Sequence, residues 1–142
     1  MRRLSGADRT VGRDAAEPCD RTARRGSWML PEAKHENLLY VVDEVARDVY
    51  VYSYPQGVLV GTLSLHYPTG DCVDKAGNVW IDTVEPSGPP AIQEYAHGGT
   101  TPISTLYFPD DGDDPISCSV DRATGNLALR GFRVTSARLS LN

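Results

Sequence analysis

An internal repeat constrains this chain more than any other sequence feature. A Val-Asp pair followed by a Gly-Asn turn occurs twice, at Val73, Asp74, Gly77 and Asn78 and, with one residue inserted, at Val120, Asp121, Gly125 and Asn126. A second set of matches has a constant offset of 43 residues and joins Tyr52, Thr62 and Leu63 to Tyr95, Thr105 and Leu106. Apolar triplets at 39–41, 79–81 and 127–129 also correspond. The period therefore lies in the low-to-mid forties, and a repeat of this length decides the architecture of the chain.

Each copy of the repeat predicts β-strands. Segments 38–42 and 49–54 are rich in β-branched and aromatic residues, and each is too short to be a buried helix. The turn between Asp74 and Val79 contains Gly and Asn, which tolerate the positive φ of a tight hairpin. Matching turns are expected at 55–57 and 97–100, and one full copy is expected to hold four strands, at 69–74, 79–83, 92–96 and 102–107.

Four short strands in one repeat are typical of a propeller blade. We therefore predict an all-β chain that forms an incomplete β-propeller of about two to two-and-a-half four-stranded antiparallel blades. The predicted boundaries are a disordered basic tail over 1–30 and a partial propeller over 31–142, divided into a partial blade at 38–63, a complete blade at 69–107 and a partial blade at 115–142.

Two stretches of the repeat carry a family resemblance. The segment from Cys72 to Ile81 resembles the core of NHL-type propeller repeats and of the six-bladed group that includes gluconolactonase-like and streptogramin-lyase-like proteins. The segment from Glu94 to Ile103 is similar to uncharacterised bacterial propeller proteins, which are often exported. The resemblance spans residues 28–129 and implies the fold, but no metal-ligand set or His-bearing loop of those enzymes can be matched. Such proteins close a ring of about six blades, and whether this chain is a fragment of a longer gene product stays open.

Charge is distributed unevenly along the chain. Residues 1–34 carry eight Lys/Arg against five Asp/Glu, whereas residues 36–129 carry three against fourteen, a net of -11. The N-terminal stretch has few sizeable aliphatic residues to offset the entropy lost on ordering, which predicts the disordered tail. The acidic body disfavours nucleic-acid binding. No segment is apolar enough to span a membrane or to form the core of a secretory signal, and the compartment stays open.

The three cysteines, Cys19, Cys72 and Cys118, are an odd number at no metal-ligand spacing. Neither a zinc site nor a disulfide framework is indicated by this pattern. We therefore expect partly buried free thiols.

Carboxylates are the strongest candidates for chemistry. Asp74 and Asp121 could serve acid-base work or bind calcium, but they are repeat-equivalent, which favours a role in capping their own hairpins. The densest acidic cluster surrounds Gly112 and comprises Asp110, Asp111, Asp113 and Asp114. Its spacing matches no calcium loop and prolines bracket it, so a solvated connector is favoured, with calcium binding as the open alternative.

The histidines and the recurring aromatic residues favour structural roles. His35, His66 and His97 are scattered, and nothing places them beside a Ser or Cys nucleophile. His97 is expected at a packing or turn position, and Tyr40, Tyr52, Trp80 and Tyr95 are expected in the cores of blades. We accordingly expect no catalytic, cofactor-binding or metal-binding residues.

The predicted function is a non-enzymatic scaffold or interaction module. Because terminal blades expose apolar faces, the chain is expected to self-associate through them. The alternative is an inactive or partial fragment of a metal-dependent lactonase-like or lyase-like propeller enzyme. Sugar or peptide binding at an open blade edge is a third possibility, since loops carry such specificity without a sequence signature.

Overall fold

A computed structural model describes residues 26–84, 87–108, 114–131 and 138–139. Most of the predicted basic tail (residues 1–25) and three members of the acidic cluster (Asp110, Asp111 and Asp113) lie outside these residues. Within them the chain is all-β, as predicted, apart from the 3-10 helix η1 (Pro31–His35). No helix in the described part of the chain is long and apolar enough to cross a bilayer.

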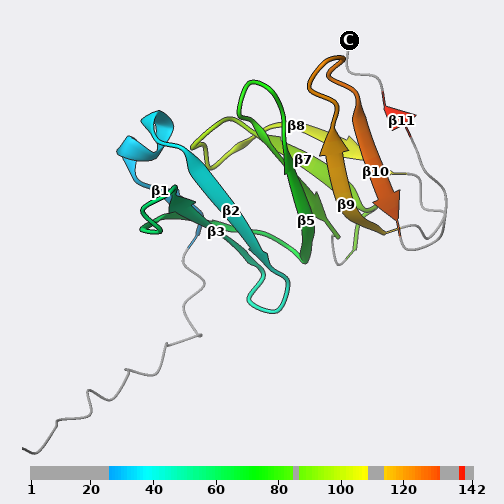
Figure 1. Ribbon diagram of the computed structural model, residues 1–142. Helices are drawn as coiled ribbons and strands as arrows, with labels where there is room; N and C mark the ends of the chain where they lie inside the picture. The colour runs from blue at the N-terminus through cyan, green and yellow to red at the C-terminus, as the bar shows by residue number, and fades with distance from the viewer. Residues whose placement is uncertain (1–25, 85–86, 109–113, 132–137, 140–142) are drawn as a thin grey trace, which may run out of the picture.

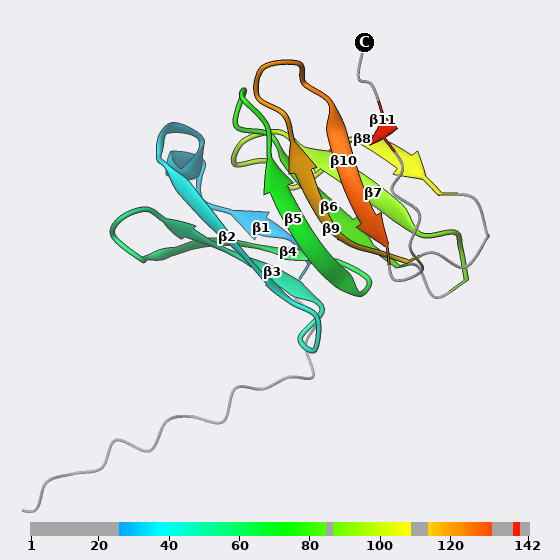
Figure 2. The same cartoon turned by 45° about the vertical axis from the view of Figure 1, so that its right-hand side comes forward.

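The strands form three antiparallel sheets that follow one another along the chain (Figures 1 and 2). The first sheet has the order β1-β4-β3-β2 and consists of β1 (Trp28–Met29), β2 (Leu38–Asp43), β3 (Asp48–Ser53) and β4 (Leu59–Ser64). The second has the order β5-β6-β7-β8 and consists of β5 (Pro68–Val73), β6 (Val79–Thr83), β7 (Ala91–Tyr95) and β8 (Pro102–Tyr107). The third has the order β11-β10-β9 and consists of β9 (Pro115–Val120), β10 (Leu127–Gly131) and β11 (Arg138–Leu139). The sheets do not close into a ring, which confirms the incomplete propeller of blade-like sheets.

Strand register shows which strands of the three sheets correspond. Leu39 pairs with Tyr52 as Val79 pairs with Tyr95, so β2 and β3 correspond to β6 and β7. Leu63 pairs with Val49 as Leu106 pairs with Ile92, so β4 corresponds to β8. In the same way Val73 pairs with Val79 as Val120 pairs with Leu127, so β5 and β6 correspond to β9 and β10.

The first sheet differs from the second at both edges. It has no described counterpart of the inner strands β5 and β9, and β2 therefore ends the sheet. At the opposite edge it gains β1, which pairs with β4. The sequence predicted a partial blade that starts at residue 38 and a tail that runs to residue 30, whereas Trp28 and Met29 at the end of that tail belong to the first sheet.

Tertiary contacts explain why β1 forms in a stretch that has little strand character of its own. The Leu30 N–H donates to the Val60 carbonyl oxygen at 2.8 Å, and the Ser64 N–H donates to Ser27 Oγ at 3.0 Å. Gly61 makes room for the strand, because a Cβ at this position would collide with the Met29 side chain. Strand β1 is thus held by β4 and not by local propensity.

Two apolar cores lie between the sheets. The core between the first and second sheets contains buried residues from both, namely Ala33, Tyr40, Val49, Val51, Val60, Leu63, Val79, Ile81 and Tyr95. The core between the second and third sheets contains Trp80, Ile92, Leu127 and Leu129. Residues 79 and 81 therefore face the first sheet, whereas Trp80 between them faces the third, as the alternation of a strand buried on both faces requires.

Candidate functional site

The repeat-equivalent acids Asp74 and Asp121 cap their own hairpins. Asp74 Oδ1 accepts the Asn78 N–H at 2.9 Å, and Asp121 Oδ1 accepts the Ala123 N–H at 2.9 Å. Gly77 and Gly125 adopt φ values of 89° and 73° in these turns, where a residue with a side chain would be strained. The predicted capping role is confirmed for both residues.

The three histidines lie apart from one another. His35 is exposed at the end of η1, and His66 lies between β4 and β5. His97 is half-buried in the β7–β8 turn, with Nε2 at 2.8 Å from the Glu36 carbonyl oxygen and Nδ1 at 3.3 Å from that of Gly77. A neutral imidazole carries one N–H and donates to one of these oxygens at a time. His97 thus lies between the β5–β6 turn of its own sheet and the segment that precedes β2 of the first sheet, which confirms the predicted packing or turn position.

A metal site finds no support in the described residues. Asp114, the one described member of the acidic cluster, is exposed. No group of three or more His, Cys, Asp or Glu side chains in the described ranges is arranged to hold a metal ion. Calcium binding by the loop from Asp110 to Asp114 stays a prediction.

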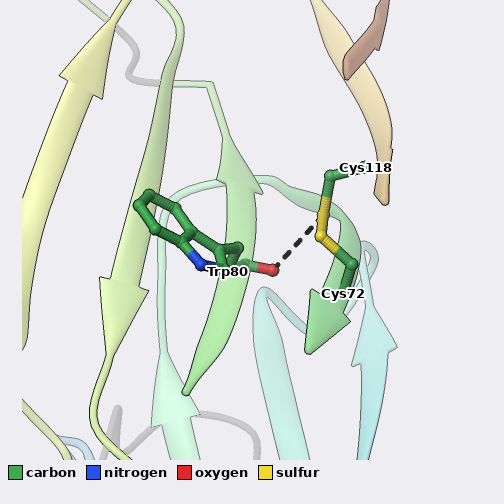
Figure 3. The surroundings of a disulfide bond; sticks show 3 residues. All are labelled: Cys72, Trp80 and Cys118. Atoms are coloured by element: carbon green, nitrogen blue, oxygen red, sulfur yellow. Dashed lines mark hydrogen bonds between the residues drawn. A yellow bond between two sulfur atoms is a disulfide. The ribbon is translucent and has the colours of Figure 1, made fainter. Parts of the chain in front are cut away.

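Cys72 and Cys118 form a disulfide, so the expectation of free thiols was wrong for these residues (Figure 3). The bond joins β5 to β9 across a sequence separation of 46 residues, with the two Cα atoms 5.5 Å apart. The strands approach closely: Thr69 Oγ1 donates to the Pro115 carbonyl oxygen at 2.7 Å, and a Cβ at Gly70 would lie 2.6 Å from the Ile116 carbonyl oxygen. Cys19 lies outside the described residues.

The repeat contained a signal for this disulfide. Since Val73 corresponds to Val120, Cys72 corresponds to Ser119, and Cys118 corresponds to Asp71. The two cysteines therefore stand one residue apart in the repeat, and successive residues of a strand point to opposite faces. One cysteine points to the following sheet and the other to the preceding sheet, so they meet between consecutive sheets.

Two buried polar groups with no hydrogen-bond partner among the described residues lie on β6, which pairs with the strand that carries Cys72. Asp82 on β6 is fully buried, and neither of its carboxylate oxygens accepts a hydrogen bond from a described residue. Burial, with a smaller contribution from Asp71, raises the pKa of Asp82 to about 7. Trp80 Nε1, two residues earlier on the same face of β6, is also buried and has no partner in the described ranges. Nothing in the sequence distinguished Asp82 from an exposed acid.

Further carboxylates on the second sheet have perturbed acidity. Burial raises the pKa of Asp71 on β5. Burial also raises the pKa of Glu94, with the Asn78 hydrogen bond acting in the opposite direction. Burial and the charge of Asp71 raise the pKa of Tyr40, against the Gly98 N–H that its hydroxyl accepts at 3.3 Å. The strands that carry Tyr40 and Asp71, β2 and β5, contact each other between the first and second sheets.

The outer face of the first sheet exposes residues whose counterparts are buried. Leu39 and Val41 are 49% and 41% exposed, whereas Val79 and Ile81 are both 0% exposed beneath the first sheet. The third copy behaves like the second, since Leu127 and Leu129 are 0% and 7% exposed beneath the second sheet. The same positions are covered by a preceding sheet in two copies and are uncovered in the first.

The prediction of blade-core aromatics is confirmed for three of the four residues and was wrong for Tyr52. Tyr40, Trp80 and Tyr95 are buried, and Tyr52, on the uncovered face with Leu39, is half-buried. In the described residues, the candidate side chains thus serve mainly in packing and in hairpin caps. The histidines and the buried acids do not gather in one site. An apolar sheet face next to a free strand edge is suited to association with another polypeptide.

Comparison with known proteins assigns this chain to no family: no protein-family model matches the sequence, and no curated protein matches it.

Proposed function

We propose that this chain is a non-enzymatic propeller-repeat scaffold that acts by association. Its working surface is the uncovered face of the first sheet, and its partner there is the same face of a second copy. The observation that carries the proposal is the contrast between exposed Leu39 and Val41 and their buried counterparts Val79 and Ile81. Apolar sheet faces of this kind gain free energy when another sheet removes them from water.

The composition of this face supports a two-fold association. Leu39 and Val41 lie on the same face of β2, and Tyr52 lies opposite Leu39 in the neighbouring strand. Trp28 of β1 and Leu59 of β4 add further exposed apolar area on the same sheet. A face made of apolar and aromatic side chains is complementary to itself, and an isologous dimer requires such a face.

Light scattering after size-exclusion chromatography tests the proposal across a wide range of protein concentrations. The wild-type chain is expected to associate as concentration rises. The double variant Leu39→Ser/Val41→Ser is expected to be monomeric and to keep the melting transition that the wild type shows at low concentration, because it removes apolar area from the surface and not from a core.

The matched control is Val45→Ser, since Val45 is 92% exposed in the β2–β3 turn, away from this face. It should associate like the wild type. A wild-type chain that stays a cooperative monomer at every concentration would refute the proposal.

The disulfide supports a proposal about the compartment in which this scaffold works. Disulfides persist in oxidising surroundings and are rare in the reducing cytosol. We place the folded chain in an oxidising compartment, with Cys72 and Cys118 bonded. Thiol alkylation followed by mass spectrometry of the protein from its native source should leave these two cysteines unmodified until a reductant is added.

A further inference from the structure

The free edge of β2 is the position at which the other two sheets carry an inner strand. β5 pairs with β6, and β9 pairs with β10, but the equivalent edge of β2 pairs with no described strand. In the described part of the chain, the segment before β2 is η1, and before it β1 runs along the opposite edge of the sheet.

The backbone of β2 offers hydrogen bonds at this edge. The Tyr54 N–H donates to the Asn37 carbonyl oxygen at 2.7 Å, so residues 37 and 54 form a hydrogen-bonded pair of the antiparallel ladder. Because such pairs alternate, the N–H and C=O groups of Leu38, Tyr40 and Val42 point away from β3. This edge also lacks the lysine, proline or bulge that commonly protects an edge strand from pairing.

Asp71 faces the same edge from the second sheet. Asp71 corresponds to Cys118, which reaches back from β9 to bond Cys72 on the inner strand of the preceding sheet. Asp71 therefore points back from β5 toward the position that an inner strand beside β2 would take. No described residue forms a hydrogen bond or an ion pair with its carboxylate, which is only half-buried. The contact between β2 and β5 agrees with this placement.

We propose that the free edge of β2, next to β5, binds an extended segment of a partner protein, which pairs antiparallel with β2 and presents a basic side chain to Asp71. β-Strand addition supplies main-chain hydrogen bonds for affinity, and side-chain contacts supply specificity. The net charge of -11 over residues 36–129 favours approach of a basic segment. The inference extends the proposed scaffold function, and it uses the edge of the first sheet, not the face that carries Leu39 and Val41.

The inner strand β9 provides the probe. Two capped synthetic peptides have the sequence of Pro115–Val120, with Cys118 replaced by serine. They differ at position 119, where one carries Lys and the other carries Glu. Position 119 is chosen because Ser119 is the counterpart of Cys72, which faces the following sheet. Each is titrated into the full-length 15N-labelled chain, and binding is followed at the amides of β2. The Lys peptide is expected to bind about fivefold more tightly than the Glu peptide, as for a partly exposed ion pair.

Two variants test the edge and the charge separately. Leu38→Pro removes an edge N–H that β3 does not use, and it should abolish binding of both peptides while the amide spectrum stays dispersed. Asp71→Lys should reverse the preference in favour of the Glu peptide, and this variant keeps the test decisive if Leu38→Pro fails to fold. Asp114→Lys makes the same charge change at an exposed site and should leave the preference for the Lys peptide intact.

The outcomes separate this inference from the scaffold proposal. Equal affinity for the two peptides, or an unchanged preference in Asp71→Lys, would overturn the assignment of a basic partner. Failure of both peptides to bind would overturn strand addition altogether. A third outcome is that Leu38→Pro abolishes self-association, whereas Leu39→Ser/Val41→Ser does not. This result would show that a second copy binds the edge of β2, and it would also refute the inference. If Leu39→Ser/Val41→Ser abolishes self-association, the scaffold proposal is supported whatever the peptide experiments show.

Discussion

The two interfaces between neighbouring sheets are built differently. Between the first and second sheets, Tyr40 reaches across to accept the Gly98 N–H, and Val42 packs against an apolar core. Between the second and third sheets, the corresponding positions are Trp80, whose Nε1 has no described partner, and Asp82, whose buried carboxylate has none. Only this second interface in the described part of the chain carries a disulfide.

The difference teaches how equivalent interfaces of a repeat can be stabilised by different means. Unpaired buried polar groups weaken a packed surface, because each has lost its hydrogen bonds to water. A cross-link between β5 and β9 compensates by restricting the unfolded chain over 46 residues of sequence. The first interface has Val42 at the position of Asp82, so it does not bury a carboxylate there.

Among the changes that test the difference between the two interfaces, removal of the disulfide should cause the largest loss of stability. The variant Cys72→Ser/Cys118→Ser is expected to lose about 3 to 4 kcal/mol of unfolding free energy, measured by urea denaturation. Hydrogen exchange should accelerate in β9 and β10 more than in β2 and β3, because only the former are tied to their neighbour by the bond. Cys19→Ser, which keeps the bond, is the control, and an equal rise of exchange in all these strands would contradict the comparison.

Valine occupies the position of Asp82 in the first interface, so Asp82→Val should make the second interface more like the first. Asp82→Val is expected to stabilise the protein by about 2 kcal/mol at pH 8, since it removes a buried unpaired carboxylate. The folded-state pKa of about 7 lies above the unfolded value of 3.8, so the unfolded chain ionises first. The wild type therefore loses stability as pH rises from about 4 to about 7, and the advantage of the variant grows over that range.

Urea unfolding of both proteins across this pH range isolates the contribution of Asp82 from those of Asp71 and Glu94. The pKa values of those two carboxyls are raised as well, and they remain in both proteins. Asp114→Val, which replaces an exposed acid by the same residue, is the matched control. If Asp82→Val proved destabilising at pH 8, Asp82 would have a partner in the folded protein.

The smallest effect is expected at the first interface. Tyr40→Phe removes the hydroxyl that accepts the Gly98 N–H, and the loss of one hydrogen bond should lower the unfolding free energy by about 1 kcal/mol. Tyr54→Phe, at a side chain that is 61% exposed, is the matched control and should leave stability unchanged. Equal stability of Tyr40→Phe and wild type would show that this hydrogen bond adds nothing to the first interface.

Much of the fold could be predicted because its determinants are local. Alternating β-branched and aromatic residues specify strands such as β3 and β6, and Asp74 with Gly77 specifies a hairpin, whatever lies around them. Comparison of the copies also predicted correctly that Tyr40, Trp80 and Tyr95 are core residues. The candidate site was less accessible, because the exposure of Leu39 depends on which sheet lies beside it.

The sequence by itself determined the strands, their turns and the repetition of one sheet, since these follow from side-chain alternation and turn chemistry over a few residues. Only the tertiary structure decided the pairing of β1 with β4, the bond between Cys72 and Cys118, and the burial of Asp82. Each of these depends on segments distant in sequence that meet when the sheets stack. Contacts between such segments are set by the packing of whole sheets, and local sequence carries little information about them.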